Sequence, residues 1–393
     1  MTTAREGLGL RPSDLVPLPG RSLTLAVLSG TASVSERPVA KEQYLAVMAL
    51  AELQREFARR GWNRKATARI VAELAVHFLI AMGGLAVVVF AGNIFLRAAG
   101  LLVSTFGLIG LATNTHTSTH YASSDKRWLN QALAFFGYPF CLALSATFWW
   151  HKHVDLHHSA PNVIGVDEDA DLLPWFALTE RDVAGSHGLK RWYFEHAQWW
   201  VFPVALAGNG FQMQLNSWLH LFRILRRRDR RKPEHWIDLA AMSSHYVVWV
   251  GLPCLFFPVT HVLLLYALRI VLAGYALYAV VGPGHLPAEA ARVDRGQEQT
   301  DYMLLQTACT VNFHTGPVGR WLCSGLEYQV EHHLFPNTSH VYYPKISPIV
   351  RDFCRGHGLP YRSYSWPRAV WLSWAVLRSA QPVHAELEEL RGG

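Results

Sequence analysis

Two long apolar stretches constrain the fold of this chain more than any other feature. They cover residues 74–115 and 237–281, and few charged side chains interrupt them. Because one helical membrane crossing needs about 20 apolar residues, each stretch is long enough to cross a membrane twice. We therefore predict two helical hairpins, one turning near Gly92–Arg97 and the other near Pro253 and Pro258.

Composition and charge agree with a membrane protein. Only 17% of the residues are charged, against roughly 25% in a typical soluble domain. Basic residues gather at 55–69 and 226–232, next to the apolar stretches, which is typical of segments that stay on the cytoplasmic side. This placement argues against a nucleic-acid-binding protein, whose basic residues would form a face with stacking aromatic residues.

The predicted fold is all-α: an integral membrane protein with four transmembrane helices in two hairpins and a cytoplasmic, histidine-rich helical cap. The hairpins return the chain to one side, so residues 116–236 and 282–393 should share the cytoplasmic face. Two weaker apolar stretches, 129–148 and 199–222, are expected to lie in the membrane plane or to re-enter it. We divide the chain into an irregular N-terminal segment (1–40), an amphipathic interfacial helix (41–73), a membrane domain (74–360) and a C-terminal tail (361–393).

Three histidine clusters lie just outside the apolar stretches. Residues four apart share one helix face, so His116 can bind a metal ion together with His120. The same spacing pairs His153 with His157, while the adjacent His158 points elsewhere and can reach a second ion. Together the clusters supply seven candidate ligands: His116, His120, His153, His157, His158, His332 and His333.

Seven histidines are enough for two metal ions. Imidazole suits iron, zinc, copper and nickel, but the chain lacks the HExxH pattern of zinc proteases and the carboxylate pattern of soluble diiron bundles. No cysteine pair has CxxC spacing, which excludes a thiolate zinc site. Two iron ions held by nitrogen ligands and activating dioxygen fit this donor set best.

The residues around these clusters resemble those of the membrane fatty acid desaturase superfamily, in particular its front-end acyl desaturases. The segment WHKHVDLHHSAPNVIGVD at 150–167 is similar to their second histidine box, and GLEYQVEHHLFP at 325–336 is similar to their third. The resemblance covers about residues 70–360. It implies a four-span membrane enzyme with a cytoplasmic diiron centre, which uses dioxygen and two electrons to insert a double bond into a lipid acyl chain. In this resemblance Gln329 takes the place of the first histidine of the third box and joins the metal ligands.

The sequence departs from the family in two places. Family members often have Asn where Glu327 stands, so a hydrogen bond near the site should differ. Many also carry a fused cytochrome b5 domain with an HPGG haem motif, which is absent here. We therefore expect electrons to come from a separate protein, of the ferredoxin or cytochrome b5 type.

His285 is predicted as an eighth histidine ligand. Two irons with four or more ligands each need more than seven histidines, and glutamine is a poorer iron ligand. His285 follows the second apolar stretch in the sequence Gly-Pro-Gly-His-Leu-Pro (282–287), where glycine and proline can bend the chain toward the cap. It also matches a histidine in a similar loop of front-end desaturases.

The acidic run that contains Asp167, Asp169 and Asp171 lacks the glycine and glutamate of a calcium-binding EF-hand loop. It either orients ligand histidines or forms a solvated loop. Of the twelve other histidines, six are considered as ligands and stay outside the predicted set: His77, His151, His245, His261, His314 and His340.

The predicted function is oxygen-dependent desaturation of a fatty acyl chain that lies in a water-free tunnel beside the irons. A hydroxylase or other oxygenase is the alternative enzyme. A non-catalytic membrane metal-binding or transport protein is the alternative of another class, but its ligands would lie at mid-membrane depth rather than outside the apolar stretches. The sequence leaves open the chain length, the double-bond position and the acyl carrier (CoA, acyl carrier protein or phospholipid).

Overall fold

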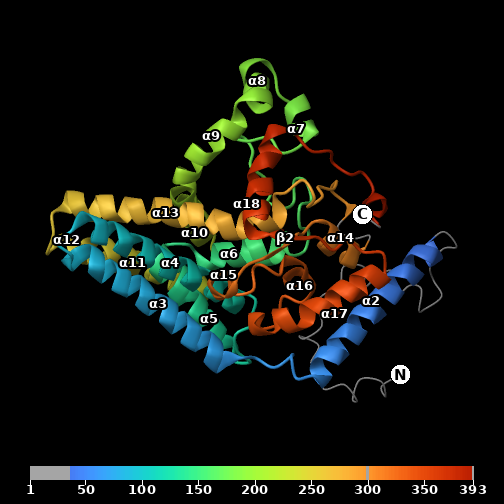
Figure 1. Ribbon diagram of the computed structural model, residues 1–393, viewed down its shortest axis with the longest axis horizontal. Coiled ribbons are helices and arrows are strands. Elements are labelled where there is room, and N and C mark those ends of the chain that lie inside the picture. The colour runs from blue at the N-terminus through green and yellow to red at the C-terminus, as the bar shows by residue number, and fades with distance from the viewer. Residues whose placement is uncertain (1–35, 298–300, 392–393) are drawn as a thin grey trace.

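The computed structural model describes residues 36–297 and 301–391, and helices dominate it (Figure 1). Long helices gather at one end of the molecule: α3 (Thr67–Phe90), α4 (Ile94–Thr119), α10 (Asn209–Arg226), α11 (Pro233–Tyr246) and α13 (Val259–His285). Among the described residues, three helices are long and apolar enough to cross a membrane, namely α3, α4 and α13. The expectation of a helical protein with membrane-length apolar segments is confirmed.

Helices α3 and α4 form a closely packed pair. The predicted break near Gly92 is present, because α3 ends at Phe90 and the Asn93 side chain caps α4 by accepting a hydrogen bond from the Phe95 nitrogen at 2.7 Å. A Cβ atom added to Gly84 would lie 2.3 Å from the backbone nitrogen of Ser104. Small residues of this kind let the backbones of two helices approach closely. In lipid the hydrophobic effect does not drive apolar helices together, so the van der Waals contacts of such close packing stabilise the pair instead.

We expect Gly84→Ala to destabilise the protein by about 1–3 kcal/mol, the usual penalty for overpacking a tight contact. The added methyl group would overlap the backbone of α4. Gly83→Ala is the matched control, since a Cβ at the neighbouring glycine meets nothing within 4 Å. Thermal unfolding of the detergent-solubilised variants should show a lower Tm for Gly84→Ala alone; equal Tm values would contradict this packing argument.

The predicted first arm of the second hairpin differs from expectation. It consists of α11, a π-helical turn (η5, Val247–Gly251) and the short helix α12 (Leu252–Cys254), so it does not qualify as a single span-length helix. The π-helical turn interrupts the regular hydrogen-bond ladder, and Pro253 lacks the N–H that would continue it. The chain then turns, and Pro258 is the N-cap of α13, which begins at Val259.

Two segments between the long helices are built from short helices. The first, which follows α4, contains α5 (Arg127–Phe135), η2 (Phe136–Phe140), α6 (Ala146–Trp149) and the π-helical η3 (Trp150–His157). The second, which precedes α10, contains α7 (Glu180–Ala184), α8 (Gly188–His196) and α9 (Gln198–Ala205), and these helices project from the rest of the molecule in Figure 1. Neither of the two weaker apolar stretches contributes a helix that qualifies as a membrane span.

The other end of the molecule is a compact cap, and the segment that leads into it from the N-terminal side differs from expectation. The predicted helix over 41–73 is divided, because α2 (Glu36–Arg59) stops before Gly61, whose φ is +71°, and α3 starts only at Thr67. Helix α2 also packs into the cap, where Phe57 meets the Phe335 ring at 5.0 Å. Residues 1–35 of the predicted irregular segment lie outside the described residues.

The C-terminal residues are part of the fold rather than a tail. Helix α18 (Trp366–Ala375) lies against α13, and the Trp366 indole donates to the Ala279 carbonyl at 2.7 Å. The expectation of an all-α fold needs one correction, since β1 (Asn312–His314) pairs in parallel with β2 (Ser363–Ser365). The remaining cap helices are α14 (Tyr302–Ala308), α15 (Pro317–Cys323), α16 (Gln329–Leu334) and α17 (Tyr343–Gly356).

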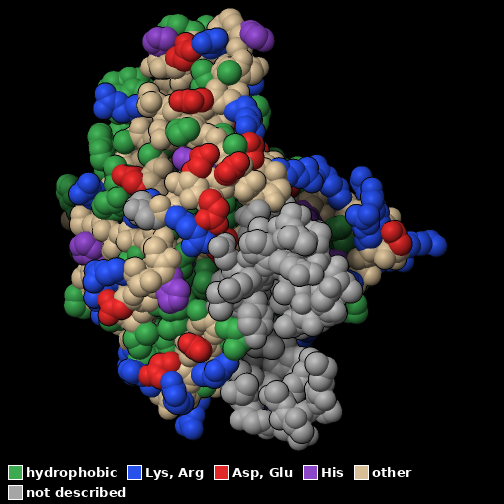
Figure 2. Space-filling view, turned by 90° about the vertical axis from the view of Figure 1, so that its right-hand side faces the viewer, with side chains coloured by type: hydrophobic (Ala, Val, Ile, Leu, Met, Phe, Trp, Pro, Cys, Tyr) green, Lys and Arg blue, Asp and Glu red, His purple; other side chains and the backbone are tan. Residues whose placement is uncertain are grey.

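The two ends of the molecule present different surfaces. The face that carries the cap shows Lys, Arg, Asp and Glu side chains spread over its visible part (Figure 2). The long helices instead expose large apolar side chains to their surroundings, for example Phe90 at 84% and Phe95 at 80%. Exposed apolar surface of this extent is costly in water and suits a lipid environment.

Candidate metal centre

All eight predicted histidine ligands are buried and meet where the long helices join the cap. His116 lies in the last turn of α4, with His120 directly after it, and His285 is the last residue of α13. The cap adds η3 and its C-cap from one side and α16 from the other. Four separate elements therefore deliver imidazole rings to one place.

The first histidine group contains five rings whose candidate ligand atoms all lie within 4.8 Å of one another: His116, His120, His153, His158 and His332. Nε2 of His153 is 2.8 Å from Nε2 of His116 and 3.3 Å from Nε2 of His158. Atoms at these distances can share one metal ion.

The second histidine group contains His157, His285 and His333. Gln329 adjoins it, because its Oε1 lies 3.2 Å from Nε2 of His285. The group has fewer imidazoles than the first, and the amide oxygen of Gln329 is the nearest substitute for a fourth. The two groups lie side by side, as shown by the ring centroids of His158 and His333, which are 4.2 Å apart.

The second histidine cluster takes part in more than one group. As the spacing of four residues predicts, His153 and His157 lie close enough to hold one ion, together with Asp169, but His153 also belongs to the first group and His157 to the second. The reason is the π-helical conformation of η3, in which the His158 nitrogen bonds to the carbonyl of His153, five residues back. A π-helix turn places residues five apart on one face, so His153 pairs with His158 and His157 turns to the second group.

Several inward-facing ring nitrogens have no partner within the described part of the chain. They include Nε2 of His120, His157, His332 and His333, all buried and without a hydrogen bond. A buried polar atom without a partner costs about 1–3 kcal/mol, so this many together would be a heavy penalty unless they share a ligand. The donor set therefore fits metal ions.

The protonation state of the rings also favours metal binding. Burial, with the neighbouring His157, lowers the pKa of His120 to about 3. Burial and the surrounding histidines hold the pKa of His158, His332 and His333 well below the ordinary value. These rings are neutral at physiological pH, and a neutral imidazole is the form that offers a lone pair to a metal.

Carboxylates behind the rings set their orientation. Nδ1 of His157 lies 2.8 Å from the Asp167 carboxylate, and Nδ1 of His153 lies 2.9 Å from Asp169. Burial alone would lower the pKa of His157, but the adjacent Asp167 charge raises it. Of the two interpretations of the acidic run, these contacts favour the orienting role for the two residues: an ionised carboxylate can only accept, so each makes Nδ1 the donor and leaves Nε2 for a metal ion.

Three further supporting residues carry no signal in the sequence. The Gln306 amide oxygen lies 2.8 Å from Nδ1 of His333, and the Tyr343 hydroxyl lies 3.2 Å from Nδ1 of His332. Asn162 donates its side-chain amide to the carbonyls of His285 and three other residues. Their roles follow from tertiary contacts between distant segments, so residue type and spacing could not identify them.

Glu327, singled out as a departure from the family, lies beside the centre but outside both groups. It is 1% exposed, and neither carboxylate oxygen has a hydrogen-bond partner among residues 36–297 and 301–391. Arg320 is the nearest cation, at 3.9 Å. Burial raises the pKa of Glu327 to about 8.

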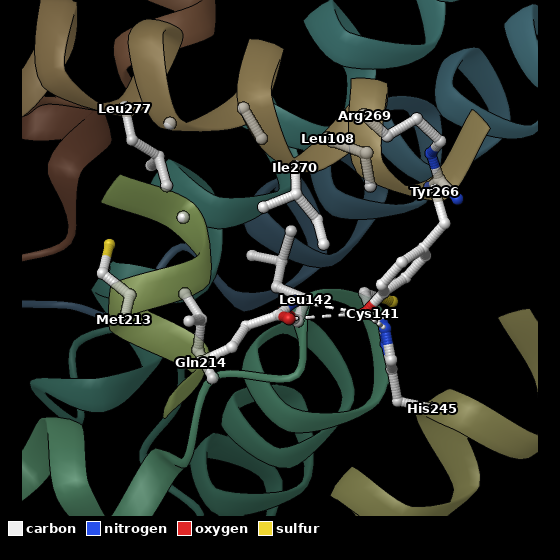
Figure 3. Close-up of a pocket in the computed structure, with 14 residues that line it drawn as sticks. Leu108, Cys141, Leu142, Met213, Gln214, His245, Tyr266, Arg269, Ile270 and Leu277 are labelled. Atoms are coloured by element: carbon white, nitrogen blue, oxygen red, sulfur yellow. Dashed lines mark hydrogen bonds between the residues drawn. The ribbon is translucent and has the colours of Figure 1, made fainter. Parts of the chain in front are cut away.

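A cavity opens among α4, α10, α11 and α13 (Figure 3). Its walls are mostly apolar, and one edge is polar because the Tyr266 hydroxyl lies 2.8 Å from Nε2 of His245 and faces Gln214. At a helical rise of about 1.5 Å per residue, the lining residue Leu108 lies about 12 Å before His116 on α4. The cavity is therefore on the side of the histidine groups away from the cap.

The fold and the site define a helical protein with membrane-length apolar helices and two adjoining histidine groups that can hold metal ions. Residues 92–365 match the fatty acid desaturase family. The chain therefore belongs to the fatty acid desaturase family, whose members are oxidoreductases acting on acyl lipids. The resemblance noted from the histidine clusters is confirmed.

Relatives of this chain include front-end desaturases from distant organisms. It is 26% identical over 327 residues to the sn-1 linoleoyl-lipid 6-desaturase of Synechocystis sp., which covers 78% of this chain and 87% of the relative. It is 26% identical to the Delta(5) fatty acid desaturase fat-4 of Caenorhabditis elegans and 27% identical to the Delta(8)-fatty-acid desaturase 2 of Arabidopsis thaliana. Those matches cover 69% and 65% of this chain, but only 61% and 58% of the relatives' lengths.

Proposed function

We propose that this protein is a dioxygen-dependent desaturase that holds two iron ions and introduces a double bond into a lipid-linked fatty acyl chain. The observation that carries the proposal is the pair of adjoining histidine groups whose buried ring nitrogens have no partner among the described residues. The first group supplies five imidazoles to one ion; the second supplies three, supplemented by Gln329.

The residues of the chain divide the work around the metals. Bound iron would use dioxygen to supply the oxidising power that an unactivated C–H bond requires. Asp167 and Asp169 hold the ligand rings in one orientation, so little reorganisation is needed during the reaction. The burial of all eight histidines keeps bulk water away from the site, which prevents side reactions of an oxidising centre.

The relatives suggest the type of substrate and the position of the new bond. Two of them are named as desaturases of a linoleoyl lipid at carbon 6, from Synechocystis sp. and Arthrospira platensis. We propose by analogy an acyl chain linked to a membrane lipid, with the new double bond on the carboxyl side of an existing one. The apolar cavity of Figure 3 would receive the methyl end, since it lies beyond the metal centre among the long helices.

If the cavity receives the methyl end, Met213→Trp should shift the product toward shorter acyl chains. Met213 lines the cavity on α10, and one methylene too many in an apolar pocket costs about 10–200-fold in specificity. Leu215→Trp is the control, because Leu215 lies on the same helix and is 51% exposed. Gas chromatography of cells fed acyl chains of graded length gives the ratio of desaturated short-chain product to desaturated long-chain product. If this ratio is unchanged in Met213→Trp, the cavity does not bind the substrate.

We further propose four membrane crossings, with α11, η5 and α12 as the fourth, and the cap on the cytoplasmic side. The basic segments at 55–69 and 226–232 support this orientation. In a Cys254→Ser background, Asp125→Cys and Asp229→Cys should react with an impermeant thiol reagent only from the cytoplasmic side, and Gly92→Cys only from the other. All three positions are exposed. The reverse pattern at any of them would refute the topology.

Fatty-acid profiling of a heterologous host tests the function as a whole. The host must supply a ferredoxin or cytochrome b5 with its reductase, because the sequence carries no haem or flavin motif to replace them. New double bonds would support the proposal. New hydroxyl groups would replace it with a hydroxylase, and metal binding with unchanged fatty acids would replace it with a non-catalytic protein.

A further inference from the structure

A chain of hydrogen-bonded side chains connects the surface with the first histidine group. Glu73 on α3 accepts from the Arg69 guanidinium at 2.8 Å, and its other oxygen lies 3.1 Å from Nε2 of His340. Nδ1 of His340 lies 2.8 Å from the hydroxyl of Thr117, which follows His116 on α4. The Glu73 side chain is 15% exposed, whereas His340 and Thr117 are buried. The outer end of this chain is thus open to solvent, and its inner end lies next to a predicted metal ligand.

A small cavity continues the connection inward from Thr117. Its lining includes His120, His332 and Tyr343, and it has room for about one water molecule. Ser324, Thr338 and Tyr343, which carry hydroxyl groups, also line it and offer polar partners to a water molecule. A water molecule in this cavity would extend the hydrogen-bonded chain from the Thr117 hydroxyl to the inward face of the first histidine group.

The fold holds His340 in this position from two sides. The preceding residue, Ser339, donates to the Ala122 carbonyl just after α4 and accepts from the Ala66 nitrogen just before α3 at 3.2 Å. These two bonds hold the segment that contains His340 against both helices. Gly325 has φ +89°, and a Cβ there would lie 2.6 Å from Cβ of His340. A side chain at position 325 would therefore push His340 away from Thr117.

We propose that Glu73, His340 and Thr117 form the path by which protons reach the site of oxygen reduction. The inference rests on the proposed function. Desaturation converts –CH2–CH2– to –CH=CH–; the two hydrogen atoms removed, two electrons from the external donor and two protons reduce one dioxygen to two waters. Each turnover must therefore bring two protons to a buried site. The Glu73 carboxylate first takes up a proton from solvent and gives it to Nε2 of the His340 tautomer that carries its hydrogen on Nδ1. Nδ1 then gives its proton to the Thr117 oxygen, and the Thr117 hydroxyl passes its own proton to the cavity water, which restores a neutral His340 and an ionised Glu73.

Substitutions at Thr117 test the path most directly. Thr117→Val removes the hydroxyl with little change of shape, and Thr117→Ser retains it. Positioned proton transfer contributes about 10²–10⁴-fold to rates, so we expect Thr117→Val to lower kcat at least tenfold and to raise the solvent deuterium isotope effect, because proton delivery becomes rate-limiting. Thr117→Ser should keep most of the wild-type turnover. Glu73→Gln should also slow turnover. Glu56→Gln is the control: Glu56 lies on α2 and also pairs with arginines, but it is not part of the path, so this substitution should leave turnover unchanged.

Two measurements independent of turnover accompany the kinetics. The iron content of Thr117→Val should equal that of the wild type, and a high-resolution structure of the wild type should show one ordered water between Thr117 and the first histidine group. A slow Thr117→Val variant with reduced iron, or with the wild-type isotope effect, would overturn the path in favour of a structural role. Wild-type rates in both Thr117→Val and Glu73→Gln would overturn it as well. A wild-type protein that forms no desaturated product would instead refute the proposed function, and this inference with it.

Discussion

Replacing His285 with alanine should abolish desaturation and remove about one of the two bound metal ions. The second histidine group has only three imidazoles, and the loss of one leaves His157 and His333 with the weaker amide donor of Gln329. Two imidazoles and an amide oxygen make a poor site for iron, whereas the first group keeps all five of its rings. Iron analysis of the purified variant, together with fatty-acid profiling, gives both quantities.

His261→Ala provides the matched control for this experiment. His261 lies near the start of the same helix, α13, and is exposed, so its loss should change neither iron content nor activity. The prediction fails if His285→Ala retains two iron ions per chain and desaturates at the wild-type rate. Retention of iron with loss of activity would also contradict it, because the assigned role is metal binding.

Asp167→Asn should weaken metal binding by about 10–100-fold, the usual cost of removing the residue that orients a metal-bound histidine. Asp167 is 2% exposed, and its Oδ2 receives hydrogen bonds from both Nδ1 of His157 and the Asn162 nitrogen at 2.8 Å. Oδ1 accepts from the Asp169 nitrogen at 2.9 Å. An asparagine cannot accept at both ends, so its NH2 group must face a donor. The His157 ring then loses its fixed tautomer and orientation.

Metal titration of the apo-protein against a chelator of known affinity measures this effect. Asp171→Asn is the control, because Asp171 belongs to the same acidic run but is exposed and accepts only from the Leu173 nitrogen. Activity at limiting iron should fall for Asp167→Asn and recover at higher iron. Equal affinities for the two variants would show that the Asp167 contact does not position His157.

The candidate metal ligands could be read largely from the sequence, and the structure brings them together in buried groups. Histidines at spacings of one to five residues beside apolar stretches are uncommon, and three such clusters within one chain indicate a metal centre. The prediction for His285 rested on a count of ligands and on the bend expected at Gly282–Gly284; in the structure this residue lies with His157 and His333.

The assignment of each histidine to a group was not accessible in the same way. Sequence spacing assumes a regular α-helix, in which positions four apart share a face. The residues Trp150–His157 instead form a π-helix, and the extra residue per hydrogen-bonded turn brings His158 to the first group beside His153, while His157 joins the second. Local propensity does not favour a π-helix, so the contacts of the surrounding elements must stabilise it.

The sequence by itself determined which segments are apolar, which residues can bind metal and to which family the chain belongs, because each of these depends on composition and short-range spacing. Only the tertiary structure decided how the rings divide between two groups and which side chains support them. Gln306, Tyr343 and Asn162 contact ligand segments that are 11 to 123 residues away in the chain. The burial that keeps the rings neutral likewise depends on four elements meeting at one place, and no single stretch of sequence contains that information.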